Sequence, residues 1–236
     1  MKSSGNGKFG IFVTGTDTGV GKTVVAAGLL AQLRADGVDA VPMKPVQTGC
    51  RVVRGRRLAP DLAFSLKAAG LKPGQRELAD MAPYCFTPAC SPHLAAKEAG
   101  VTLSLPVIER AFRRLNRAHE AVVVEGAGGI LVPLNERQTM LDLMIRLGLP
   151  VLLVARPGLG TLNHTLLSVW AMRAAGLTVL GVILNQAKPG RWGRIEDDNR
   201  RTIERLGGVK VLGCVRYGDP VQSFPATRSI LVPGGI

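Results

Sequence analysis

The stretch that most constrains the fold of this chain is Phe9–Thr23, FGIFVTGTDTGVGKT, in which an apolar run leads through a glycine-rich turn into a helix-prone segment. Such a turn leaves backbone N–H groups unpaired, and the helix N-terminus adds positive potential, so together they hold polyphosphate oxygens. Lys22 is expected to reach the β- and γ-phosphates, and the Thr23 hydroxyl to ligate Mg²⁺. The segment therefore predicts a phosphate-binding loop between a strand and a helix.

The spacing of this loop is a variant of the pattern G-x-x-x-x-G-K-[ST]. Thr16 stands where the pattern has its first glycine, although Gly15, Gly19 and Gly21 keep the loop flexible. The alternative is a glycine-rich turn that arose by chance. The order of strand, loop and helix favours the phosphate loop.

The rest of the chain alternates between apolar runs and amphipathic segments, which predicts a doubly wound, mostly parallel α/β sheet. With the predicted phosphate loop after its first strand, this sheet is expected to be of the P-loop nucleoside triphosphatase type. We expect one domain over residues 1–236, with a flexible tail at 1–8 and a surface-wrapping tail at 217–236. Residues 51–57 are predicted to form a basic loop, and residues 72–92 loops and short turns. Strands are expected at 39–43, 121–124, 151–155, 178–184 and 209–214, and helices at 22–36, 61–69, 106–119, 140–147, 163–175 and 195–206.

Composition limits the location and the partners of the chain. No apolar run approaches the roughly 18 residues that a membrane span needs, and residues 1–8 are too short and polar for a signal peptide. We therefore expect a cytoplasmic protein without a membrane partner. Four cysteines, at positions 50, 85, 90 and 214, form no C-x-x-C pair, so reduced structural thiols are expected.

The chain is strongly basic, with 30 Lys and Arg against 17 Asp and Glu and a formal net charge of +13. Such a charge can indicate a polyanionic partner. However, the basic residues are mostly arginines scattered along helix faces, as at Arg110, Arg113 and Arg117, with few aromatic residues between them to stack on bases. A compositional bias is the favoured interpretation, and no nucleic-acid partner is expected.

Two further polar residues, Glu125 and Lys44, are predicted at the ends of strands, where open parallel sheets bind ligands, and a third, Asp61, is predicted to open a helix. Glu125 ends an apolar strand, where a carboxylate without a cation would be costly, so it is the best candidate for a Mg²⁺ ligand. Asp61 fits either a second ligand or a plain helix N-cap. Lys44 follows the strand beside the loop and could stabilise charge on a transferred phosphate. Gly126–Gly129 offers backbone amides to a ligand.

Six short motifs are spread along the chain between Phe9 and Cys214. They are GTDTGVGKT at 15–23, KPVQTG at 44–49, SPH at 91–93, VEGAGG at 124–129, GLGTLNH at 158–164 and VILN at 182–185. Together they resemble the dethiobiotin synthetase family. The resemblance implies a P-loop fold and an ATP-dependent ligase of biotin synthesis that closes a ureido ring on 7,8-diaminononanoate with CO₂. It further implies a carbamate, a mixed carbamic-phosphoric anhydride, and release of ADP and phosphate.

The resemblance also implies roles for individual residues. Lys22 and Lys44 are the implied catalytic residues, which clamp phosphate and carbamate oxygens. The implied Mg²⁺ ligands are Thr23, Asp61 and Glu125. The implied nucleotide site comprises Thr18, Gly19, Val20, Gly21, Lys22, Thr23, Val24, Asp61, Glu125, Gly126, Ala127, Gly128, Asn185, Gln186, Arg216 and Tyr217, with Asn185 at the adenine edge. The implied substrate site comprises Thr18, Lys44, Thr48, Gly128, Thr161, Leu162 and Asn163.

In this family the helix start corresponding to residues 161–163 forms a pocket for the substrate carboxylate that belongs to the partner subunit, so a homodimer is implied. The chain departs from the family pattern at three positions. Arg216 stands where the family usually has proline, and Gly19 and Gly158 replace longer polar side chains found in some members.

A different class of function is a partition or septum-site ATPase, a nucleotide-dependent switch that binds DNA or a protein partner. Such ATPases carry a second lysine early in the phosphate loop. The corresponding residues here are Thr16, Asp17 and Thr18. The missing lysine favours the ligase.

Overall fold

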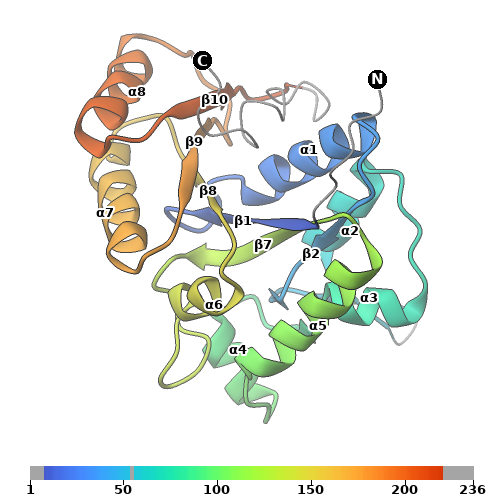
Figure 1. The fold of residues 1–236 in the computed structure, drawn as a ribbon. Helices are drawn as coiled ribbons and strands as arrows, with labels where there is room; N and C mark the ends of the chain where they lie inside the picture. The colour runs from blue at the N-terminus through green and yellow to red at the C-terminus, as the bar shows by residue number, and fades with distance from the viewer. Residues whose placement is uncertain (1–7, 54–55, 220–236) are drawn as a thin grey trace.

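A six-stranded sheet forms the centre of the computed structural model, which describes residues 8–53 and 56–219 (Figure 1). Every pair of neighbouring strands in this sheet is parallel, and the strand order is β10-β9-β8-β1-β7-β2. The predicted doubly wound, parallel sheet is confirmed. Its strands are β1 (Phe9–Gly15), β2 (Ala40–Met43), β7 (Ala121–Gly129), β8 (Val151–Ala155), β9 (Val179–Asn185) and β10 (Val211–Val215).

Helices cover both faces of the sheet. Helix α1 packs on one face, and α5, α6 and α7 pack on the other (Figure 1). This arrangement follows from the connections, because each parallel pair needs a crossover and a helix is its usual form. The helices are α1 (Lys22–Ala35), α2 (Pro60–Ala68), α3 (Gln75–Met81), α4 (Pro92–Glu98), α5 (Leu105–Ala118), α6 (Met140–Leu147), α7 (Thr161–Ala174) and α8 (Arg194–Gly207).

Strict alternation along β1 divides the interior into two cores. Ile11 and Val13 face α1, whereas Phe12 faces the opposite core with Ile108 of α5. Because successive side chains of a strand point to opposite sides, a central strand must be apolar throughout to serve both cores. This is why the sequence around the phosphate loop begins with an uninterrupted apolar run.

Two segments contain more regular structure than the sequence predicted. Residues 72–92, expected to be loops, include α3 and the short strand β6 (Tyr84–Cys85), which pairs with β3 (Val46–Gln47). Of residues 51–57, expected to form a loop, residues 51–53 belong to β4 (Arg51–Val53) and residues 56–57 to β5 (Arg56–Leu58), which pair antiparallel; residues 54–55 lie outside the described residues. These elements are too short for their own periodicity to predict them, and tertiary pairing stabilises them.

Two element boundaries also differ at the ligand-binding edge. Strand β7, expected to end at Val124, continues through the glycines to Gly129, which pairs with Gly15 of β1. Helix α7 begins at Thr161 rather than at Asn163. In addition, the helix that contains Asp61 has Ala59 at its N-cap, so the N-cap interpretation of Asp61 is wrong.

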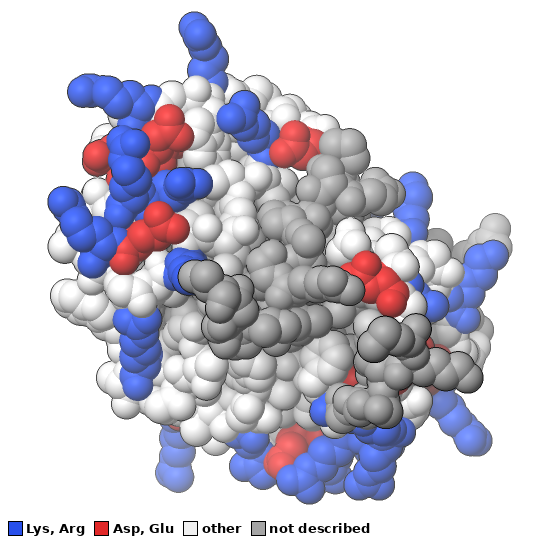
Figure 2. All heavy atoms as spheres, turned by 45° about the horizontal axis from the view of Figure 1, so that its top comes forward, with Lys and Arg blue, Asp and Glu red and all other residues white. Residues whose placement is uncertain are grey.

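Charged side chains are dispersed on the face that Figure 2 shows, where Asp and Glu lie among the Lys and Arg side chains rather than leaving one continuous basic patch. All four cysteines are free thiols, as predicted. None of the described helices combines the length and the apolar character needed to cross a membrane. The expected tails fall outside the described residues, apart from Lys8 and residues 217–219.

Candidate active site

The predicted phosphate loop occupies residues 16–21 and joins β1 to α1. Gly19 and Gly21 have left-handed backbone conformations, with φ of 73° and 97°. At Gly21 a side chain would also clash, because its Cβ would lie 1.9 Å from Nδ2 of Asn185. Glycine is therefore required there for both conformation and space. The N–H groups in the first turn of α1 have no intrahelical partners, so they remain available to an anion.

Lys22 begins α1 and extends back over the loop. Its Nζ donates a hydrogen bond to the backbone oxygen of Asp17 at 2.8 Å, and the Asp17 carboxylate pairs with Arg156 at 2.7 Å. Burial, and then repulsion from nearby Lys44, lowers the pKa of Lys22 to about 8. The ammonium group is thus charged at neutral pH and poorly hydrated, which favours strong interaction with an anion.

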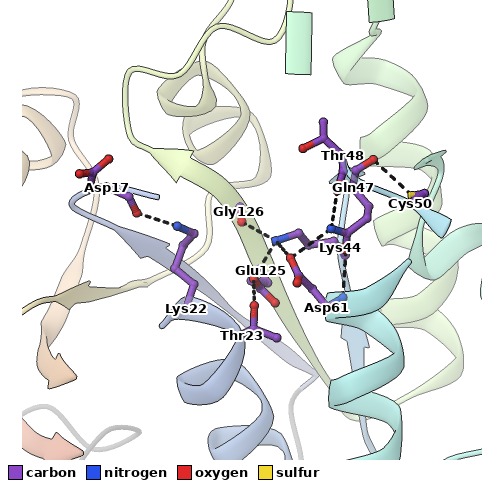
Figure 3. A network of polar contacts seen from close by, with 10 residues as sticks. All are labelled: Asp17, Lys22, Thr23, Lys44, Gln47, Thr48, Cys50, Asp61, Glu125 and Gly126. Atoms are coloured by element: carbon purple, nitrogen blue, oxygen red, sulfur yellow. Dashed lines mark hydrogen bonds and ion pairs between the residues drawn. The ribbon is translucent and has the colours of Figure 1, made fainter. Parts of the chain in front are cut away.

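A second lysine lies opposite, in a compact group of charged residues (Figure 3). Lys44, which follows β2, places Nζ 2.7 Å from Oε1 of Glu125 and 2.8 Å from Oδ2 of Asp61. Burial alone would lower its pKa, but these two carboxylates raise the pKa of Lys44 above its usual value. The same pairing, working against burial, lowers the pKa of Asp61. Thr23 completes the group by donating its hydroxyl proton to Glu125 Oε1 at 2.8 Å.

Gln47 is a polar residue of this group that sequence reasoning did not identify. Its side chain is buried, and its Nε2 donates to Oδ2 of Asp61 at 3.2 Å. Its Oε1 accepts the backbone N–H of Asp61, also at 3.2 Å. The two bonds fix both the carboxylate and the first turn of α2. The signal in the sequence was the position of Gln47 between Lys44 and Thr48, within one motif.

These residues line a cleft of about 670 Å³ at the carboxyl ends of the strands. The predicted site residues that line it are Thr18, Gly19, Gly21, Lys22, Thr23, Lys44, Thr48, Asp61, Glu125, Ala127 and Gly128. Its wall also includes residues to which no role was assigned, namely Val46, Gln47, Pro60, Ala89, Cys90, Ser91, Pro92 and Val132. The cleft thus brings together the phosphate loop, both lysines and both carboxylates.

Other predicted site residues lie outside the lining of this cleft. Asn185 contacts the loop from behind, with Nδ2 donating to the backbone oxygen of Val20 at 2.9 Å, and Gly126 gives its backbone oxygen to Lys44 at 3.0 Å. Thr161 is buried against Thr165, whereas Asn163 is exposed. The predicted residues outside the lining are Val20, Val24, Gly126, Thr161, Leu162, Asn163, Asn185, Gln186, Arg216 and Tyr217.

Comparison with known proteins identifies the family. A family model described as an AAA domain matches residues 10–223. An ATP-dependent dethiobiotin synthetase from Anaeromyxobacter dehalogenans (strain 2CP-1) is 50% identical, over 92% of this chain and 89% of that protein. One from Aromatoleum aromaticum is 39% identical, over 94% of this chain and 97% of that protein. The chain belongs to the dethiobiotin synthetase family.

Solved structures outside the dethiobiotin synthetases share the fold. The septum site-determining protein MinD of Pyrococcus horikoshii, complexed with Mg-ADP, superposes with a TM-score of 0.58 over 94% of this chain and 89% of that chain, at 16% identity. A ParA family ATPase from Chlorobium tepidum gives 0.56, over 95% and 93% of the two chains, at 13% identity. At such identities the likeness shows the P-loop fold alone.

The cleft contains side-chain oxygen atoms of the kind that coordinate a nucleotide-bound Mg²⁺. Among the described residues no group of three His, Cys, Asp or Glu side chains forms a metal site. Mg²⁺ in nucleotide sites, however, takes only one or two carboxylates and completes its octahedron with phosphates and water. Asp61, Glu125 and the Thr23 hydroxyl provide that type and number of ligands.

The low pKa of Lys22 predicts a pH dependence of nucleotide binding for this member of the dethiobiotin synthetase family. Above pH of about 8, Lys22 loses its proton in the free protein. If Lys22 holds phosphate oxygens, as the sequence predicts, the affinity for ATP should then fall by up to about tenfold per pH unit, because only the protonated ammonium group attracts an anion. Titration with a fluorescent ATP analogue at several pH values measures this. The Lys22→Arg variant, which stays charged, should lose the dependence. An ATP affinity of the wild type that does not change with pH would contradict the prediction that Lys22 binds the phosphates.

Proposed function

We propose that this chain is an ATP-dependent dethiobiotin synthase, which closes a ureido ring on 7,8-diaminononanoate with CO₂. The observation that carries the proposal is the convergence of Lys22 and Lys44 on one cleft beside Asp61 and Glu125. Family membership supports it, because curated relatives at 39–51% identity are named ATP-dependent dethiobiotin synthetases. Phosphoryl transfer depends mainly on positioning and charge stabilisation, which such a cleft provides.

The proposed reaction has three steps. One amine of the diamine takes up CO₂ and loses a proton, giving a carbamate. A carbamate oxygen then attacks the γ-phosphorus of ATP, and the bond between that phosphorus and the bridging oxygen of the β-phosphate breaks. ADP departs, and the product is a mixed carbamic-phosphoric anhydride. The second amine attacks the carbamoyl carbon and loses a proton while phosphate leaves, which closes the ring.

The two lysines would act at the two ends of the transferred phosphoryl group. Lys22, held over the loop by Asp17, would bind the β- and γ-phosphate oxygens. Lys44 would face the carbamate and the incoming side of the phosphoryl group, where negative charge develops. The Thr48 hydroxyl, which lines the same cleft, would hydrogen-bond the carbamate or the substrate amine. Thr18 and Gly128 are proposed as further substrate contacts.

A magnesium ion is the proposed cofactor, and Thr23, Asp61 and Glu125 would hold it. When bound, Mg²⁺ would neutralise charge on the β- and γ-phosphate oxygens. The protein supports this role through Gln47, which orients the Asp61 carboxylate, and through Thr23, which contacts Glu125.

The base of the nucleotide is proposed to bind beyond the loop, at the carboxyl ends of β9 and β10, where Asn185, Gln186, Arg216 and Tyr217 lie. Arg216 replaces the usual proline of the family and places its guanidinium carbon 5.7 Å from the ring centroid of Trp192. These two planar groups offer a surface on which a nucleobase can stack.

A homodimer in the cytoplasm is the proposed working state. The residues 161–163, implied in binding the substrate carboxylate, lie outside the cleft lining of their own subunit. Near them Leu159 is 92% exposed, and Leu167 and Trp170 of α7 are also exposed. An exposed apolar surface of this kind is typical of an interface, which would bring the helix start of one subunit to the cleft of the other.

The test is to incubate the protein with Mg·ATP and bicarbonate, with and without the diamine, and to measure ADP release together with the mass of the product. Diamine-dependent ADP release with a ureido product is the expected result. ADP release that DNA stimulates and the diamine does not would instead identify a switch of the partition ATPase type. The Lys44→Ala variant serves as a control, because it should not form the ureido product at the wild-type rate.

A further inference from the structure

The Lys44 ammonium group is surrounded by oxygen atoms on three sides (Figure 3). Its Nζ lies 2.7 Å from Glu125 Oε1, 2.8 Å from Asp61 Oδ2 and 3.0 Å from the backbone oxygen of Gly126. An ammonium group has three protons, so these three acceptors satisfy all of its donors. Only 4% of the residue is exposed. Lys44 is thus a buried and completely hydrogen-bonded cation.

Two of these oxygens belong to the carboxylates that the proposed function assigns to Mg²⁺. Protein oxygens lie about 2.0–2.1 Å from Mg²⁺, so two of its ligands must approach each other closely, with no room for an ammonium group between them. A monovalent and a divalent cation at that separation would also repel each other strongly. We propose that Lys44 and the divalent ion compete for Glu125 and Asp61, so that metal binding moves the lysine toward the substrate. The inference rests on the proposed function.

Other contacts hold the carboxylates in place while the lysine leaves. Glu125 Oε1 keeps the hydrogen bond that the Thr23 hydroxyl donates, and Asp61 Oδ2 keeps the one that Gln47 Nε2 donates. The backbone N–H of Asp61 also donates to Gln47 Oε1. Lys44, in contrast, has a flexible four-carbon stem with rotatable donors. Of the groups in this cluster, the lysine is therefore the one that can move without breaking the arrangement of the others.

The competition couples metal entry to delivery of the lysine. Without a nucleotide, a metal ion must displace a buried ammonium group that then has no equivalent acceptors, so the free protein binds divalent ions weakly. With a nucleotide, phosphate oxygens give Lys44 new acceptors as the metal takes the carboxylates. Lys44 would thus reach the reacting oxygens only when the metal-nucleotide complex is in place.

The test measures Mn²⁺ binding to the nucleotide-free protein by electron paramagnetic resonance. Because removal of Lys44 leaves two carboxylates without their cation, the Lys44→Met variant should bind Mn²⁺ at least about tenfold more tightly than the wild type. Lys22→Met is the matched control. It also removes a nearby positive charge, but Lys22 donates to a backbone oxygen rather than to these carboxylates, so its gain in affinity should be clearly smaller than that of Lys44→Met. Equal gains in the two variants, or no gain in Lys44→Met, would overturn the proposal.

A second measurement uses the wild type and does not depend on the stability of a variant. The ammonium ¹⁵N resonance of Lys44 should keep its position when Mg²⁺ alone is added and should shift when Mg²⁺ is added with a non-hydrolysable ATP analogue. A resonance that stays unchanged with both present would refute the displacement. If the ureido product forms but Mn²⁺ binding and the Lys44 resonance do not change as expected, only the proposed competition is wrong. If both measurements change as expected but no ureido product forms, the proposed reaction is wrong.

Discussion

The Lys22→Ala variant should lose at least about a thousandfold in kcat, measured as diamine-dependent ADP release, because it removes the buried cation that we propose binds the phosphates. ATP affinity should fall as well, since Lys22 is expected to contact phosphate before and during the reaction. Its ammonium group lies over the loop, where it donates to the backbone oxygen of Asp17, and residues 16–21 contain no lysine or arginine that could replace it.

Stability provides the control for this variant. The pKa of Lys22 is lowered to about 8 in the folded protein, so the unfolded chain binds the proton more tightly. The charged group therefore opposes folding below that pH, and the opposition disappears as the pH rises. Removing it should leave the thermal midpoint at neutral pH unchanged or raised. Lys72→Ala, which removes an exposed lysine, should change neither kcat nor the thermal midpoint. Turnover by Lys22→Ala within tenfold of wild type would disprove the role.

Local patterns predicted the part of the site that is continuous in sequence. The apolar run, the glycines and Lys22 lie within fifteen residues, and their conformation follows from strand and helix rules that need no distant partner. The same rules correctly placed Lys44 directly after its strand, at the edge of the sheet where ligands bind. Glu125 lines the same cleft, but it lies within β7, which continues to Gly129. The composition of that edge was therefore readable before its geometry was known.

The sequence did not predict which of the charged side chains at this edge pair with one another. Lys44, Asp61 and Glu125 are far apart in the chain, and no periodicity determines that one ammonium group contacts both carboxylates. The sequence equally allowed Asp61 to cap its helix. In the fold, α2 packs against α1, and contacts with Gln47 and Lys44 hold the Asp61 carboxylate in the cleft. Gln47 was missed for the same reason, since its role depends on two hydrogen bonds across fourteen residues. The contacts that orient the charged side chains of the site are tertiary, whereas the conformation of the phosphate loop depends on local sequence.

The Lys44→Ala variant should separate binding from chemistry. We expect its ATP dissociation constant to stay within about threefold of wild type, because Lys22 and the loop amides remain, while kcat falls by about a hundredfold to a thousandfold. Single-turnover measurement of phosphoryl transfer, together with ATP titration, distinguishes the two effects. Lys22→Ala is the matched comparison, because it should lower both the affinity for ATP and kcat.

Stability should also change in the opposite direction from that of Lys22→Ala. The pKa of Lys44 is raised in the folded protein, so its charged form stabilises the fold below the ordinary lysine pKa, and this contribution is lost only as the pH rises through the raised value. Truncation leaves Glu125 and Asp61 without their cation, at a cost of about 3–5 kcal/mol for a buried pair. The thermal midpoint of Lys44→Ala should therefore fall at neutral pH and recover when Mg²⁺ is added. A variant that turns over at the full rate would show that Lys44 has no part in the phosphoryl step, whatever its effect on stability.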